Sequence, residues 1–240
     1  MTAAVALQQP QRGIQARAVG DTPFHGDILA ISANAGSIAE TDDVAGAADA
    51  QPAALQLDEA YVRGHDLVVD YTNAAAALKL RVYWNAEFDP AVPDLVVLTM
   101  TASLRTDLLD VEPVVRGHSR LVPSAIQRLD ASLKLVPVDA TDAPVDVSAD
   151  RCLATVFSLP GDVVYAEMAH PADVPRSLLT RSATDALATL THEMFAERLE
   201  KGVIVRARVQ GLVMLAGAEV AARLGHQYHR LTTMAPPLDA

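Results

Sequence analysis

The sequence predicts an all-β protein, an antiparallel two-sheet β-sandwich with a barrel as the alternative, because apolar and polar residues alternate in three long segments. Such alternation places one face of a strand against a core and leaves the other face wet. In the first segment, Leu80, Val82 and Trp84 share the apolar face, so the single tryptophan is expected in the core. We expect about eight to ten strands in all. The three alternating segments are residues 78–88, 96–105 and 203–210.

The chain is expected to divide into three parts. Residues 1–54 are rich in Ala, Gly, Ser and Asp, and we expect a flexible N-terminal segment there, apart from a short strand within 24–31. The sandwich domain is expected to span residues 55–230. Residues 231–240 are expected to form a tail.

Turn residues separate the remaining strands. Gly64 supplies the positive φ of a hairpin turn between strands at 60–63 and 67–72. Pro160 and Gly161 suit the central positions of a type II turn and predict a second hairpin. The further strands expected are 133–138, 153–159 and 163–169.

One segment follows a helical period. Leu187, Leu190 and Met194 recur at helical spacing, Ser182 can cap the amino end, and Gly202 follows the carboxyl end. The sequence therefore predicts one amphipathic helix near 183–201, packed across an edge or open end of the sheets. A single helical turn is expected at 220–224.

Charge and cysteine content limit the partners and the compartment. The net charge is -11, with the acidic residues concentrated between positions 21 and 173, and an acidic surface repels nucleic acids and anionic membranes. Cys152 is the single cysteine and is expected to be a small buried residue rather than a nucleophile. No segment reaches the roughly 18 apolar residues of a membrane span, and the first residues lack the features of a signal peptide. A cytoplasmic protein is expected.

Motifs for cofactors and nucleophiles are missing from the sequence, including Gly-rich phosphate loops, G-x-S-x-G, H-E-x-x-H and C-x-x-C. We therefore predict no cofactor and assign no catalytic, cofactor-binding or metal-binding residue. His226 and His229 have a helical spacing that suits a metal, but they lack a third ligand nearby. His192 and Glu193 begin a zinc-protease motif without its second histidine, and we expect them on the surface of the predicted helix.

Carboxylates at strand ends are interpreted as solvated loop charges, with two functional alternatives left open. Paired carboxylates would suit glycoside hydrolysis, and a larger group would suit calcium. The candidate pairs are Glu87 with Asp89, and Asp107 with Asp110 and Glu112. The candidate calcium ligands are Asp139, Asp142, Asp146 and Asp150.

The sequence favours a non-catalytic sandwich used for protein interaction or assembly, including self-association, because catalytic motifs are missing. A carbohydrate-binding module is the first alternative, and it requires Tyr61, Tyr71 and Tyr83 to share one exposed face. A hydrolase is the second, and it requires a pocket that joins a histidine to carboxylates. The residues considered for that pocket are His65 or His170 with Glu87 or Asp89. Finally, Arg206 and Arg208 are expected to point outward, toward acids of the same chain or of a partner.

Overall fold

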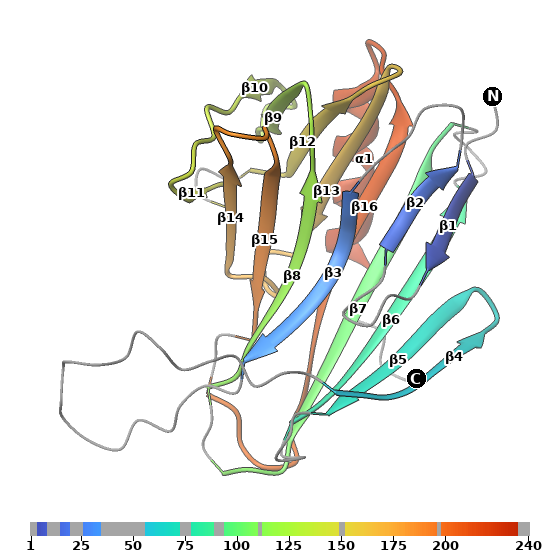
Figure 1. The fold of residues 1–240 in the computed structure, drawn as a ribbon, viewed down its shortest axis with the longest axis vertical. Helices are drawn as coiled ribbons and strands as arrows, with labels where there is room; N and C mark the ends of the chain where they lie inside the picture. Colours follow the sequence, from blue (N-terminus) through green and yellow to red (C-terminus); the bar gives the residue numbers. More distant parts are fainter. Residues whose placement is uncertain are drawn as a thin grey trace, which may run out of the picture.

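Two large antiparallel sheets pack face to face and form the body of the molecule (Figure 1). The computed structural model describes residues 4–8, 15–19, 26–34, 56–72, 78–88, 94–109, 112–148, 152–195 and 198–234. Within these residues the sheets stay separate and do not close into a barrel. The predicted all-β, two-sheet antiparallel sandwich is therefore confirmed.

The larger sheet has nine strands and is assembled from both halves of the chain. In spatial order the strands are β10 (Leu135–Pro137), β9 (Ala125–Leu129), β12 (Ala154–Leu159), β13 (Val163–Ala169), β16 (Ile204–Leu215), β7 (Val96–Thr106), β6 (Leu78–Phe88), β5 (Asp66–Thr72) and β4 (Gln56–Arg63). In this order β16 is the strand that joins the block β4–β7 to the block formed by β9, β10, β12 and β13.

The smaller sheet has five strands. In spatial order they are β11 (Val145–Asp146), β14 (Arg176–Arg181), β15 (Ala188–Met194), β8 (Val114–Leu121) and β3 (Gly26–Asn34). A separate antiparallel pair is formed by β1 (Ala4–Gln8) and β2 (Gln15–Val19).

The main core lies between the two large sheets. Leu80, Val82 and Trp84 of β6 are all buried there, as their alternation predicts. The indole Nε1 of Trp84 donates a hydrogen bond of 2.9 Å to the carbonyl oxygen of Leu29 in β3. This bond ties the edge strand of the smaller sheet to the larger one.

A second core lies on the opposite face of the nine-stranded sheet, which we call its outer face. The helix α1 (Val220–Thr233) covers this face over β12, β13 and β16, and it places Val220, Leu224 and Leu231 against the sheet (Figure 1). Because α1 covers only part of the outer face, the strands β4–β7 have a different environment there. Among the described residues, none of the helices is long and apolar enough to cross a membrane.

The predicted helix near 183–201 is wrong, because strand β15 occupies that segment. Ala188, Leu190, His192 and Met194 all point into the core with the period of a strand. A histidine at one inward position hid the apolar alternation, and leucines three and four residues apart then resembled a helix. The helix of the structure is α1, where the sequence predicted only a single turn.

Two elements extend the expected division of the chain. β3 lies where a short strand is expected within 24–31, and it pairs with β8 as part of the smaller sheet. α1 continues to Thr233, into the expected tail. Both predicted hairpins are present, and Gly64 and Gly161 have φ values of 63° and 76° at their turns.

Candidate functional site

A chain of four polar side chains crosses the otherwise apolar space between the two large sheets. The hydroxyl of Tyr165 donates to Oε1 of Glu167 at 2.6 Å. The other carboxylate oxygen, Oε2, lies 2.9 Å from Nε2 of His192. Nδ1 of His192 in turn lies 2.8 Å from Oγ of Ser177. We call these four residues the inter-sheet network.

Strand register brings the inter-sheet network together. Ser177 of β14 and His192 of β15 are cross-strand partners, and both point into the core. Tyr165 and Glu167 occupy alternate inward positions of β13 in the opposite sheet. Gly211 of β16 faces Glu167 and leaves space for the neighbouring ring, since a Cβ atom there would lie 2.7 Å from the Tyr165 hydroxyl.

Hydrogen-bond polarity assigns a role to each group of the network. Burial, followed by the nearby charge of Glu167, raises the pKa of Tyr165 well above its ordinary value, so the tyrosine stays protonated and donates. An ionised Glu167 accepts through both oxygens, and the bond at Oε2 then requires a proton on Nε2 of His192. In the neutral imidazole Nδ1 is therefore an acceptor, and Ser177 donates its hydroxyl proton to it.

A partly open cavity of about 150 Å³ borders this network. Glu167, Ser177 and His192 line one side of it. Its remaining wall comes from the segment before β12, the start of β12, the segment after β13 and α1. It includes Val147, Ser148, Cys152, Thr155, Pro171, Val174, Pro175 and Tyr228. Polar groups from both sheets therefore converge on a space that is also bounded by apolar side chains.

Cys152 lies on the cavity wall but lacks the properties of a nucleophile. Its sulfur is 3.2 Å from the carbonyl oxygen of Ala154. Burial raises the pKa of the thiol to about 11, so the thiolate is scarce at neutral pH. Cys152 is partly buried, less so than the sequence predicts, and its raised pKa favours a structural role.

A second polar arrangement occupies the outer face of β4–β7 and β16, and we call it the polar face. Three rows of cross-strand partners run over these strands. The rows are Glu59, Asp70, Arg81, Ser103 and Arg206; Tyr61, Val68, Tyr83, Thr101 and Arg208; and Arg63, Asp66, Asn85, Thr99 and Gln210.

Side chains of the polar face hold one another in place. Arg81 donates two hydrogen bonds to the carboxylate of Asp70, at 2.6 and 2.8 Å, and Asn85 donates to Asp66 at 2.8 Å. The bonds to Asp70, together with one to Tyr83, raise the pKa of the Arg81 guanidinium. The Arg81 side chain is 42% exposed and that of Asp70 is 19% exposed, so the pair is reachable from solvent.

Gln210 is the exceptional residue of the polar face. It is only 6% exposed, and its Nε2 donates to Thr99 at 3.1 Å. Its Oε1 is buried and has no hydrogen-bond partner in the described part of the chain. A buried carbonyl oxygen without a partner is costly, and such atoms are rare in folded proteins.

The arginines of β16 point outward, as expected, although Arg208 is buried. It is 4% exposed, its Nε lies 3.5 Å from the carboxylate of Asp173, and its Nη1 donates to the carbonyl oxygen of Met234. The predicted pairing of an outward arginine with an acidic residue of the same chain is therefore present at Arg208.

The tyrosine platform expected for a carbohydrate module is only partly present. Tyr61 and Tyr83 lie in one row on the outer face, on either side of Val68. Tyr71 points instead into the main core and is 9% exposed. The prediction that all three rings share an exposed face is wrong for Tyr71.

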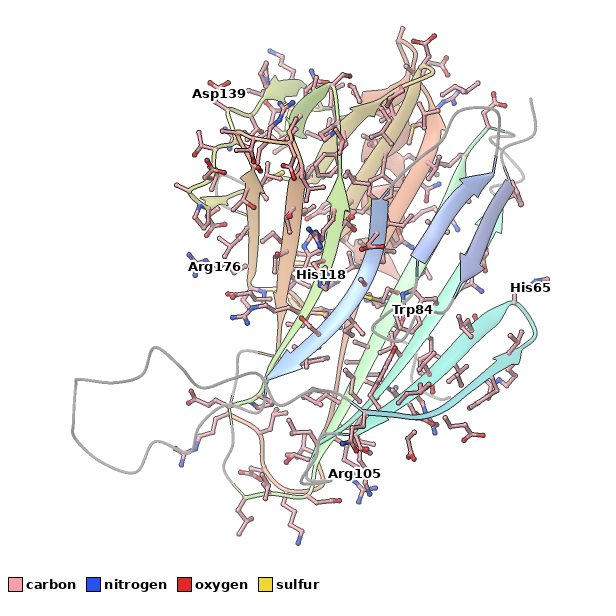
Figure 2. The ribbon with its side chains drawn as sticks, viewed as in Figure 1. His65, Trp84, Arg105, His118, Asp139 and Arg176 are labelled. Atoms are coloured by element: carbon pink, nitrogen blue, oxygen red, sulfur yellow. The ribbon has the colours of Figure 1, made fainter. Side chains whose placement is uncertain are left out.

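A pocket joining a histidine to a carboxylate exists, but it uses residues other than those proposed. Figure 2 shows His65 at the tip of the β4–β5 hairpin, and Glu87 is exposed near the end of β6. His170 lies 3.5 Å from Asp173. Asp89 lies outside the described residues. The prediction that His192 and Glu193 lie on a helix surface is also wrong, because both are in β15 and His192 is buried.

The other candidate ligands take part in local contacts. In the described residues, no group of three or more His, Cys, Asp or Glu side chains is placed to hold a metal ion. His226 and His229 are exposed on α1. Asp107 pairs with Lys79 and Arg105, Asp142 accepts from the amide of Ala183, and Asp146 pairs with Ser148 and Arg176. Glu112 and Asp139 are among the described residues and belong to no such group. Asp110 and Asp150 lie outside the described residues.

Glu167, Ser177 and Gln210 were not predicted from the sequence. For Glu167 a signal was available, because it lies within the apolar run of a predicted strand, two residues after Tyr165, so both side chains point to the same face. No such signal marked Ser177, because β14 itself was not predicted.

Comparison with known proteins identifies the fold. No family model and no curated protein matches the chain. Among solved structures, a putative aldose 1-epimerase from Escherichia coli K12 is 11% identical with a TM-score of 0.51, covering 89% of this chain and 100% of that one. A GH36 α-galactosidase from Geobacillus stearothermophilus is 11% identical (TM-score 0.46), and the match covers 88% of this chain and 31% of the galactosidase. An α-galactosidase from Lactobacillus brevis is 8% identical with a TM-score of 0.49, and the match covers 95% of this chain and 42% of that one. The chain thus spans less than half the length of these galactosidases, and its sandwich is of the kind seen in the putative epimerase.

Proposed function

We propose that this protein binds an uncharged saccharide on the polar face of the nine-stranded sheet. The observation that carries the proposal is a set of polar side chains that are reachable from solvent and already held in position by their neighbours, Arg81 by Asp70 and Asn85 by Asp66. Hydroxyl groups of a ligand can both donate to and accept from such groups. Binding then requires little ordering of the protein, because the neighbouring pairs are formed beforehand.

Charge balance on the polar face favours an uncharged ligand. Glu59 and Asp70 share the first row with two arginines, and Asp66 shares the third row with Arg63. In the central row, Arg208 is neutralised by Asp173. An anion would need an excess of unpaired arginines, whereas alternating donors and acceptors suit the hydroxyl groups of a sugar.

The central row supplies a surface for the apolar side of a sugar ring. Tyr61 and Tyr83 are partly exposed on either side of the buried Val68, and their rings combine an apolar body with a polar hydroxyl. The shared fold with a protein described as a putative aldose 1-epimerase supports the same class of ligand.

Isothermal titration calorimetry with glucose, galactose and lactose tests the proposal on the full chain. We expect saturable binding of at least one of these sugars and a loss of about tenfold or more in affinity for Arg81→Ala, because a hydrogen bond from a charged group is removed.

Arg116→Ala is the matched control. Arg116 pairs with Glu193 on the other sheet, with side-chain exposures of 39% and 17% that are close to those of Arg81 and Asp70. Its affinity should equal that of the wild type. Absence of binding to all three sugars, or equal losses in Arg81→Ala and Arg116→Ala, would overturn the proposal.

The association function favoured by the sequence stays a prediction. The observation in its favour is the edge strand β4, on which Leu57 and Val62 are 51% and 72% exposed. An edge strand with exposed apolar residues can pair with another chain.

A further inference from the structure

We propose that the cavity beside the inter-sheet network is a second, catalytic site, in which Ser177 attacks the carbonyl carbon of a short-chain acyl ester. This site uses residues other than those of the polar face, and it does not depend on saccharide binding.

The network has the order of parts that activates a serine. Ser177 donates to His192 at 2.8 Å, and the far nitrogen of the same ring is held by Glu167 at 2.9 Å. A serine, a neutral imidazole and an orienting carboxylate within hydrogen-bond reach form the general arrangement of an activated nucleophile. Here Nδ1 faces the serine and Nε2 faces the carboxylate.

The carboxylate is itself held in place. Oε1 of Glu167 accepts the hydrogen bond from Tyr165, so Oε2 is the oxygen that faces the imidazole of His192. Glu167 and Tyr165 are therefore positioning residues, because they act through His192. Ser177 and His192 are the groups expected to touch the substrate.

The position of the network beside a cavity distinguishes it from a purely structural one. Glu167 and His192 are 1% and 3% exposed, so their burial has a large desolvation cost. A network that only joined the two sheets would be expected to be packed on all sides. Ser177 instead lies on the wall of a space large enough for a ligand.

The size and lining of the cavity indicate the substrate class. A cavity of about 150 Å³ can hold a molecule about as large as benzene, which allows a short acyl chain but not a long one. Val174 and the prolines of the β13–β14 connection provide apolar contacts for such a chain. Cys152 on the same wall does not compete as the nucleophile, because its pKa is raised.

The reaction is a hydrolysis in two steps. Ser177 Oγ forms a bond to the acyl carbon while its proton passes to Nδ1 of His192; the carbon–oxygen bond of the ester then breaks, and His192 returns the proton to the departing alcohol. Water next attacks the acyl group and gives a proton to His192. That proton returns to Ser177 as the carboxylic acid leaves, and the protein is regenerated.

Phenylmethanesulfonyl fluoride is the first probe, because its phenyl ring matches the cavity and it sulfonylates activated serines with loss of fluoride. Mass spectrometry of the full-length protein should show one sulfonyl group per chain, located at Ser177 by peptide mapping. p-Nitrophenyl acetate should be hydrolysed by the unmodified protein and not by the sulfonylated one. An unmodified wild-type chain, or an adduct at another residue, would refute the proposal without reference to any variant.

Two variants complete the test. Ser177→Ala should lose both reactions, while Ser132→Ala keeps both, because Ser132 is exposed, lies outside the cavity lining and bonds to Asp130. Glu167→Gln keeps the shape of the side chain and should slow sulfonylation by about 100-fold or more. The loss should also appear in the kcat and not in the KM for p-nitrophenyl acetate, because Glu167 acts through His192 and does not touch the substrate; an unchanged kcat would exclude the positioning role of Glu167.

Discussion

Gly211 of β16 leaves the space that the ring of Tyr165 occupies beside Glu167. A Cβ atom at position 211 would lie 2.7 Å from the tyrosine hydroxyl and 3.0 Å from one ring carbon, and the ring is fully buried. The tyrosine has no free space into which it can move without losing its hydrogen bond to Glu167. The geometry of the inter-sheet network therefore depends on a residue that makes no polar side-chain contact.

Gly211→Ala is expected to destabilise the protein by about 1–3 kcal/mol, the usual cost of overpacking a core. Urea unfolding measures this loss as a lower midpoint with an unchanged slope. Gly217→Ala is the control, because a Cβ atom at position 217 meets nothing within 4 Å. If the two variants were equally stable, the close approach of Gly211 and Tyr165 would be without energetic consequence.

At the scale of single elements, the same residues explain which strands the sequence revealed. β6 and β7 carry unbroken apolar alternation, which predicts their bounds to within one residue. The alternation at 203–210 marks only the first part of β16, which continues to Leu215. β14, β15 and β8 place Ser177, His192 and Ser119 at inward positions, and β8 and β14 were not predicted while β15 was mistaken for a helix. Polar side chains inside a core interrupt the pattern that reveals a strand, so the missed strands and the missed site share one cause.

Helix α1 allows a direct test of the second core. Leu224 is fully buried against the outer face of the nine-stranded sheet, so Leu224→Ala should lower the free energy of unfolding by about 2–5 kcal/mol. Chemical denaturation followed by circular dichroism measures this change. Leu109→Ala, at a position that is 76% exposed, should remain within about 0.5 kcal/mol of the wild type. Similar values for the two variants would mean that α1 adds little to the sheet.

At the scale of the whole molecule, the thiol of Cys152 reports on global unfolding. Its pKa is raised from 9.0 to about 11 in the folded chain, chiefly by burial. At pH 8 a thiol-specific disulfide reagent should therefore react about 100-fold more slowly with the native chain than with the chain in urea. Equal reaction rates in the two states would contradict the burial of the thiol.

The same thiol makes stability depend on pH. Because the pKa of Cys152 is higher in the folded chain than in the unfolded chain, its contribution to the free energy of unfolding is complete below pH 9 and is lost as the pH rises toward 11.

The position of β16 has a consequence for synthesis of the chain. β16 follows β7 and β13 in the sequence, yet it lies between them in the middle of the nine-stranded sheet. While the chain emerges from the ribosome, the edge of β7 is therefore open from residue 106, and that of β13 from residue 169, until residue 215 has been made. During that interval the two blocks of the sheet are not joined, and the nascent chain is exposed to edge-to-edge aggregation.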